Sequence, residues 1–187
     1  EITGRKIEDV TLVCSGAGAA ALACLDLLLT LGLKKENILM VDSRGVVHSE
    51  REGLGNQYKA RYAMKTNARS LSDAMVGRDI FLGVSVADTV TQDMIKLMAP
   101  DPIIMALANP DPEIRPELVK EVSPNSIIAT GRSDYPNQVN NVLCFPFMFR
   151  GALDVGATTI NDEMKAACTH ALAALAKAEA DETVVQA

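Results

Sequence analysis

The most constraining feature of this sequence is a predicted strand that runs into a glycine turn and then into a helix. The apolar run 7–14 predicts a buried strand, and the apolar residues 20–31 predict a helix. Between them, Gly16 permits a tight turn and Gly18 lets the backbone approach a ligand closely. Ala21 lets the helix pack closely on its strand. This order of elements predicts an α/β protein.

The same segment carries a dinucleotide-binding fingerprint. A second predicted strand, 38–41, ends at Asp42, 26 residues after Gly16. In such folds an acid at this place accepts hydrogen bonds from a ribose, and the free amides at the helix start bind the pyrophosphate. The alternative is an ordinary glycine turn in an α/β core. The complete context of strand, turn, helix, strand and acid favours nucleotide binding.

The composition limits the class of protein. With 187 residues, 48% of them hydrophobic, we expect a single domain covering residues 1–187. A net charge of -6 argues against nucleic acid or an anionic membrane as partner, and no apolar run is long enough to span a bilayer. The cysteines show no CxxC spacing, which favours free buried thiols in the reducing cytoplasm.

Strands and helices alternate along the rest of the chain. This pattern predicts a Rossmann-like, doubly wound, mostly parallel sheet with helices on both faces. A polar surface loop is expected over 43–56. Further strands are expected at 79–84, 103–107 and 126–129, and helices at 57–64, 70–76, 92–98, 116–121 and from Met164 onward. Thr159 and Asp162 are placed to cap the last helix.

Polar side chains follow several of the predicted strands. Ser85 and Asn109 stand just after two of them, where ligands bind in open parallel sheets. Asn109 could instead close a turn through its own backbone. Four side-chain amides crowd residues 137–141, which suits a polar substrate and equally suits a solvated loop.

Five segments together resemble one known family over almost the whole chain. They are TLVCSGAGAAA (11–21), VDSRG (41–45), ALANPDPEI (106–114), ATGRSDYPNQVNNVL (129–143) and FRGALD (149–154). This set is similar to the NAD(P)-binding domain of malic enzyme, of the bacterial type. The resemblance implies that the whole enzyme converts malate to pyruvate and carbon dioxide while reducing a nicotinamide cofactor, either NADP or NAD.

The resemblance also implies roles for individual residues. Asn109, Asn140 and Asn141 correspond to residues near the nicotinamide and the malate, and these three form the expected substrate-binding set. The expected cofactor-binding set is Gly16, Ala17, Gly18, Ala19, Ala20, Ala21, Asp42, Ser43, Arg44, Ser85 and Asn109. Asp42 favours NAD because it repels a 2′-phosphate, whereas Ser43 and Arg44 favour NADP. Arg44 inclines our prediction slightly toward NADP.

In the family, the catalytic tyrosine and lysine and the acids that bind Mg or Mn come from a preceding domain. We therefore expect a fragment that binds cofactor without catalysis and holds no metal, within a complete enzyme that is a homo-oligomer. Tyr58, Lys59 and Tyr62 could replace the missing groups, but they fall on a predicted surface helix, where solvated side chains are expected. Two alternatives remain: the cofactor domain of an amino-acid dehydrogenase, and a nucleotide-sensing or assembly module without a reaction.

Overall fold

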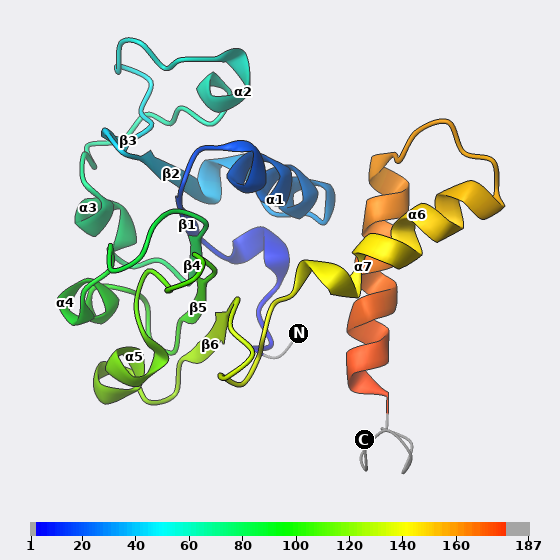
Figure 1. Cartoon of the computed structure of the whole chain (residues 1–187). Coiled ribbons are helices and arrows are strands. Elements are labelled where there is room, and N and C mark those ends of the chain that lie inside the picture. The colour runs from blue at the N-terminus through cyan, green and yellow to red at the C-terminus, as the bar shows by residue number, and fades with distance from the viewer. Residues whose placement is uncertain (1–2, 179–187) are drawn as a thin grey trace. The chain divides into compact units, whose positions relative to one another are not determined.

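A sheet of six strands organises the first part of the chain (Figure 1). The computed structural model describes residues 3–178, and the chain divides into two units, Glu1–Asn140 and Asn141–Ala187. The elements of the first unit are η1 (Ile7–Asp9), β1 (Leu12–Ser15), α1 (Ala19–Thr30), η2 (Lys35–Asn37), β2 (Ile38–Asp42), β3 (Gly45–Val46), α2 (Gln57–Ala60), α3 (Leu71–Met75), β4 (Ile80–Gly83), α4 (Gln92–Lys96), β5 (Ile103–Ala106), α5 (Pro116–Val122) and β6 (Ile127–Thr130).

The strands lie in the order β3-β2-β1-β4-β5-β6, and all pairs except β2 with β3 are parallel. Alternate residues of β1 point to opposite faces because a strand has a two-residue repeat. Val13 packs in a core with residues of α3, α4 and α5, whereas Leu12 and Cys14 pack in a second core with α1. Helices therefore cover both faces, and the predicted Rossmann-like fold is confirmed.

The predicted surface loop 43–56 was partly wrong. After β2 the chain turns back within Ser43 and Arg44, and β3 pairs antiparallel with β2. Gly45 has a φ of +103°, which a glycine adopts without strain, and the next two valines are buried. The sequence signal that could have predicted this hairpin is the pair of valines directly after Gly45. The hairpin draws the loop toward the sheet and brings its basic residues near Asp42.

Other local predictions were also wrong, and the helix over 145–154 was not predicted at all. Residues 7–9 form the short helix η1 rather than the start of a strand, and the helix expected over 57–64 is reduced to α2. The helix is short because the chain must turn after α2 to bury the side chain of Tyr62. The residue that caps the last helix is Asn161, whose Oδ1 accepts from the Met164 amide at 2.9 Å, so Thr159 and Asp162 do not cap it.

The second unit contains helices that follow the amide-rich segment. Its described elements are η3 (Asn141–Leu143), α6 (Phe145–Asp154) and α7 (Asp162–Lys177). The prediction of a single domain over 1–187 stays a prediction, and residues 179–187 lie outside the described part. No helix within residues 3–178 is both long and apolar enough to cross a membrane.

Candidate functional site

A cleft opens where the direction of strand addition reverses. From β1 the chain adds β2 on one side and later β4 on the other, so the carboxyl ends of β1 and β4 form the switch point of the sheet. Ligands of open α/β sheets bind at such a point. The cleft here measures about 490 Å³. It is lined by Ser15, Gly16, Ala17, Val41, Asp42, Ser43, Gly45, Ser70, Leu71, Ser85, Val86 and Thr89.

The turn between β1 and α1 needs glycine at its first position. Gly16 has a φ of +125°, and a Cβ added there would lie 2.6 Å from the carbonyl oxygen of Val84. The Gly16 amide donates to the Val41 carbonyl at 2.8 Å, and the Val84 amide donates to the Ser15 carbonyl at 2.9 Å. The turn is thus packed against both neighbouring strands, and any side chain at Gly16 would displace backbone.

Gly18 differs from Gly16 because the space beside it is open. Gly18 is the N-cap of α1, with extended backbone at a φ of -87°, and a Cβ added there would meet nothing within 4 Å. No side chain caps this helix. Ala19 and Ala20 are exposed, while Ala21 packs against the sheet with 1% of its surface exposed. The first amides of α1 therefore face a space that an anion could fill.

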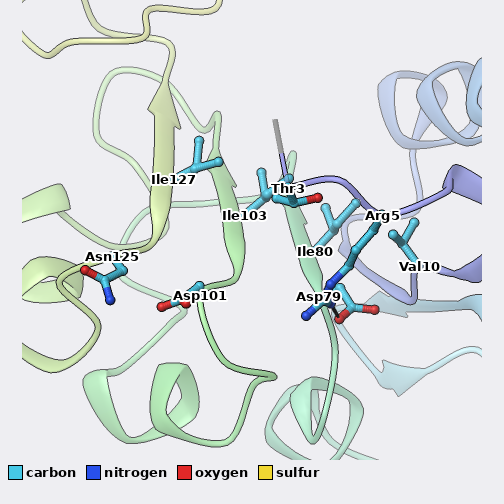
Figure 2. A pocket seen from close by; sticks show the side chains of 9 residues that line it. All are labelled: Thr3, Arg5, Val10, Asp79, Ile80, Asp101, Ile103, Asn125 and Ile127. Carbon is cyan, nitrogen blue, oxygen red and sulfur yellow. Dashed lines mark hydrogen bonds and ion pairs between the residues drawn. The ribbon is translucent and has the colours of Figure 1, made fainter. Parts of the chain in front are cut away.

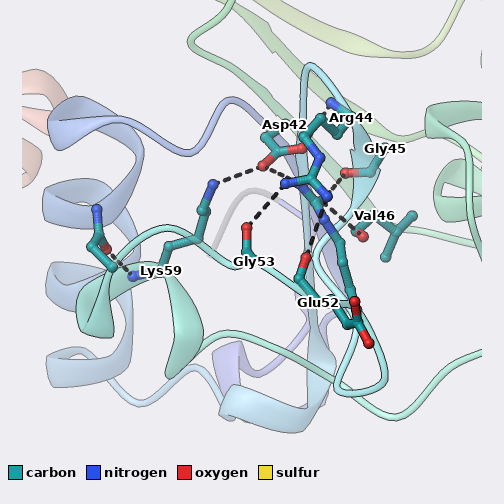
Figure 3. Close-up of polar contacts among 9 residues, drawn as sticks. Asp42, Arg44, Gly45, Val46, Glu52, Gly53 and Lys59 are labelled. Atoms are coloured by element: carbon teal, nitrogen blue, oxygen red, sulfur yellow. Dashed lines mark hydrogen bonds and ion pairs between the residues drawn. The ribbon is translucent and has the colours of Figure 1, made fainter.

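Asp42 is the centre of a polar network at the end of β2 (Figure 3). Its Oδ1 accepts from the Arg44 amide at 2.9 Å. Its Oδ2 accepts from Arg51 at 2.7 Å and from Lys59 at 2.8 Å. Partial burial alone would raise the pKa of the carboxyl, but the bonds from Arg51, Lys59 and the Arg44 amide hold this pKa well below its usual range. Asp42 is therefore an ionised group whose charge two cations neutralise.

The three basic residues around Asp42 differ in what they contact. The Arg44 guanidinium is exposed and donates to the carbonyls of Gly53 at 3.0 Å and Glu52 at 3.2 Å. Arg51 has 7% of its side chain exposed and also donates to two carbonyls of β3, at 3.1 and 3.2 Å. Arg51 thus fixes the hairpin, while Arg44 and Lys59 lie closer to solvent.

The interpretation of Lys59 and Tyr62 as solvated was wrong. Tyr62 is 1% exposed and belongs to the core on the α1 side of the sheet, and its hydroxyl donates to Asp26 of α1. Arg61 pairs with the same carboxylate. These contacts anchor the end of the α2 segment on α1 and so place Lys59 beside Asp42. Tyr58 alone of the three is exposed, at 58%.

Sequence reasoning missed Arg51 and Lys59 as neighbours of Asp42. They follow Asp42 by 9 and 17 residues in what looked like a polar loop. The available signal was the presence of basic residues in the segment after an acid at a strand end. Only the hairpin and the anchoring of α2 reveal which of these residues return to the acid.

Comparison with known proteins identifies the family. Residues 1–185 match the family model described as malic enzyme, NAD binding domain. The chain belongs to this family. The malic enzyme match decides against the alternative of an amino-acid dehydrogenase domain.

Relatives within the malic enzyme family differ in cofactor. The chain is 62% identical to an NADP-dependent malic enzyme of Haemophilus influenzae, with 100% of this chain and 25% of that protein covered. It is 52% identical to an NAD-dependent malic enzyme of Rhizobium meliloti, with 100% of this chain and 24% of that protein covered. The chain thus spans about a quarter of the length of these two relatives.

A solved malic enzyme shares the fold. The crystal structure of malic enzyme from Pyrococcus horikoshii is similar with a TM-score of 0.84 at 36% identity, covering 97% of this chain and 44% of that one. The arrangement of elements described above is therefore that of a malic enzyme cofactor domain.

The structure places the remaining predicted residues of this malic enzyme domain as follows. Ser85 lines the cleft, and its hydroxyl lies 3.0 Å from that of Ser15. Asn109 follows β5 on the same edge of the sheet, where its amide nitrogen donates to the Leu107 carbonyl at 3.3 Å. Asn140 ends the first unit and Asn141 begins the second, so their place near a substrate stays a prediction.

A second cavity lies at the opposite edge of the sheet (Figure 2). It measures about 340 Å³ and is lined by Thr3, Arg5, Val10, Asp79, Ile80, Asp101, Ile103, Asn125 and Ile127. Arg5 and Asp79 form an ion pair, and Asp79 also accepts from the Thr11 amide and hydroxyl at 2.8 and 2.9 Å. The charges of Arg5 and Asp79 therefore neutralise each other. The pair lies at the amino ends of the strands, away from the edge where such sheets bind ligands.

The described part of the chain contains no candidate metal site. Within residues 3–178, no group of three or more His, Cys, Asp or Glu side chains is placed to hold a metal ion. The four cysteines, all in the described part, are free; Cys14 is buried and the other three are half-buried. A metal in the complete enzyme stays a prediction.

Proposed function

We propose that this chain binds NADP or NAD at the cleft between β1 and β4, as part of an enzyme that oxidatively decarboxylates malate to pyruvate and carbon dioxide. The observation that carries the proposal is the contrast between the two glycines. Gly16 is closely packed, as a turn requires, whereas Gly18 faces open space at the start of an uncapped helix. A pyrophosphate fits this combination of free amides and unfilled space.

The chain's own residues would hold the cofactor in a defined orientation. We place the pyrophosphate on residues 16–21, the adenosine ribose near Asp42 and Ser43, and the nicotinamide toward Ser85 and Asn109. When bound, the nicotinamide supplies the acceptor for the hydride of malate. Asn109, Asn140 and Asn141 would donate amide hydrogen bonds on the substrate side, where they orient malate against the ring.

Among the two cofactors we propose a preference for NADP. Two cations neutralise Asp42, which weakens its repulsion of a 2′-phosphate. Arg44 brings further positive charge to the same place, and a guanidinium has five donors, more than the two bonds of Arg44 to its loop consume. The NADP-dependent relative from Haemophilus influenzae agrees with this preference, and the NAD-dependent one from Rhizobium meliloti makes the test necessary.

Calorimetric titration of Arg44→Ala and Lys59→Ala with NADPH and NADH tests the preference. Each variant should weaken NADPH binding by about 1.5 to 3 kcal/mol, the range of a charge-assisted hydrogen bond, and should change NADH binding little. Lys96→Ala serves as the control because Lys96 is an exposed residue of α4 that pairs with Asp93. Equal losses for both cofactors would show that Arg44 and Lys59 only support the loop, and NAD would become the better assignment.

A second test addresses the substrate side. In the complete enzyme, Asn141→Ala should lower malate turnover roughly tenfold to a hundredfold, because a misplaced substrate reacts much more slowly. Its cofactor affinity should stay close to that of the wild type. A variant with full turnover, or one that loses cofactor binding instead, would remove Asn141 from the substrate set.

The quaternary state and the compartment are further proposals. A homo-oligomer is supported by apolar exposure on α6, where Phe145, Phe147 and Phe149 each expose more than half of their surface. Free thiols at all four cysteines support the cytoplasm, where reducing conditions prevail. The Mg or Mn ion of the complete enzyme would come from another domain. Cofactor binding without any reaction in the complete protein would favour the sensing module instead.

A further inference from the structure

A fully buried carboxylate lies between the ends of β4 and β5. Glu113, in the segment between β5 and α5, exposes 0% of its surface. Its Oε1 accepts from the Ser85 amide at 2.8 Å and the Ser85 hydroxyl at 3.0 Å, and its Oε2 accepts from the Ala108 amide at 3.1 Å. No ion pair to Glu113 is found in the described part of the chain. These neutral donors compensate for the loss of water around the carboxylate.

The end of β4 leaves room for this carboxylate because it carries a glycine. Gly83 is the last residue of β4, and a Cβ there would lie 2.5 Å from Cδ of Glu113 and 2.7 Å from each of its oxygens. A glycine weakens a strand, and a buried charge without a cationic partner is costly. The fold retains both the glycine in the strand and the buried charge, and the two lie side by side. This coincidence indicates that the position of the carboxylate matters for more than packing.

The hydrogen bonds of Glu113 join the segments after β4 and β5 at the ligand-binding edge, and Ser85 extends this link to β1. Ser85 follows β4 and lines the cleft, and its hydroxyl also lies 3.0 Å from the hydroxyl of Ser15 at the end of β1. Ala108 follows β5 and immediately precedes Asn109. Backbone bonds strengthen the link, because the Val90 amide donates to the Glu113 carbonyl at 3.0 Å. Glu113 therefore sets where the segments after β4 and β5 stand relative to β1.

We propose that Glu113 is a positioning residue for the nicotinamide half of the cofactor. The inference rests on the proposed binding of NADP or NAD at the cleft. In dinucleotide-binding folds the adenosine ribose lies by the acid after the second strand, and the rest of the ligand extends across the switch point. Glu113 orders the segments on the far side of that point. Its loss should affect one half of the cofactor and spare the other.

The experiment compares two ligands on the 187-residue chain. NADPH carries both halves, and 2′-phosphoadenosine 5′-diphosphoribose lacks the nicotinamide. In Glu113→Gln, the amide nitrogen of the new side chain would face backbone donors, so the Kd for NADPH should rise about tenfold. The Kd for the fragment should stay within about twofold of the wild-type value, because its contacts lie over β1 and β2. The fluorescence change of the dihydronicotinamide on binding should also diminish.

Two controls make the outcome decisive. Glu121→Gln changes an exposed glutamate of α5, whose carboxylate accepts from Gln92, and should leave both affinities unchanged. Glu113→Asp keeps the charge but withdraws the carboxylate by one methylene, so it covers the case in which Glu113→Gln does not fold; it should weaken NADPH selectively but less strongly.

Each result decides between the alternatives. Equal weakening of NADPH and the fragment would show a merely structural role and overturn the inference. Unchanged NADPH affinity in the folded Glu113→Gln or Glu113→Asp variant would also overturn it. If the wild-type chain binds neither ligand, the proposed cofactor site is itself wrong, which separates that failure from a failure of the role of Glu113.

Discussion

The Gly18→Val variant should lose all measurable NADPH binding while it remains folded. A Cβ at Gly18 meets no protein atom within 4 Å, and its backbone has an ordinary negative φ, so the protein accommodates a side chain there. The valine would instead fill the space proposed for the pyrophosphate. We expect a loss of about 1 kcal/mol of stability, because valine is a poor N-cap residue. Calorimetric titration and thermal unfolding measure the two effects.

Gly16→Ala should instead destabilise the folded protein. Its Cβ would lie 2.6 Å from the Val84 carbonyl oxygen, at a φ that L-residues rarely adopt, so we expect a loss of about 3 kcal/mol in the free energy of unfolding. Ala23→Val, at an exposed position of α1, controls for added bulk. It should leave the NADPH affinity unchanged and lower the free energy of unfolding by only about 0.5 kcal/mol, because valine is a weaker helix former than alanine. Undiminished NADPH affinity in Gly18→Val would place the pyrophosphate elsewhere, whichever way Gly16→Ala behaves.

The 187-residue chain by itself should produce neither NADPH nor NADH from malate, with Mg or Mn and the matching oxidised cofactor supplied. Oxidation needs a base at the malate hydroxyl, and decarboxylation needs a cation to stabilise the developing enolate. Among the described residues no set of three side chains is placed to hold such a cation. Lys59 is paired with Asp42, and Tyr62 is buried against Asp26, so neither is available as a base.

The near-ultraviolet absorbance of NADPH provides the measurement, with the complete polypeptide as positive control. Binding of NADPH to the short chain in the same preparation would show that the absence of turnover does not reflect misfolding. Steady malate-dependent absorbance from the purified 187-residue chain would contradict the prediction. Loss of that activity in Lys59→Ala would then identify the base that we exclude here.

The sequence alone determined the order of the parallel strands and the location of the nucleotide turn. Strands at β1, β2, β4, β5 and β6 are short apolar runs bounded by glycine, proline and polar residues, so their local pattern is sufficient to place them. The contrast of Gly16 with Gly18 also followed from local rules, since each glycine satisfies a separate steric requirement of one turn. The family motifs added the malic enzyme assignment, which the comparison over residues 1–185 confirms.

Only the tertiary structure decided which polar groups meet. Asp42 looked like a free acid, yet Arg51 and Lys59 reach it from a hairpin and a short anchored helix that no local periodicity predicts. Glu113 looked like an ordinary residue of a motif, yet it proved to be a buried carboxylate that joins the ends of β4 and β5. The reason is physical: periodicity reports which face of an element is buried, whereas the pairing of charges depends on how distant segments return to the sheet.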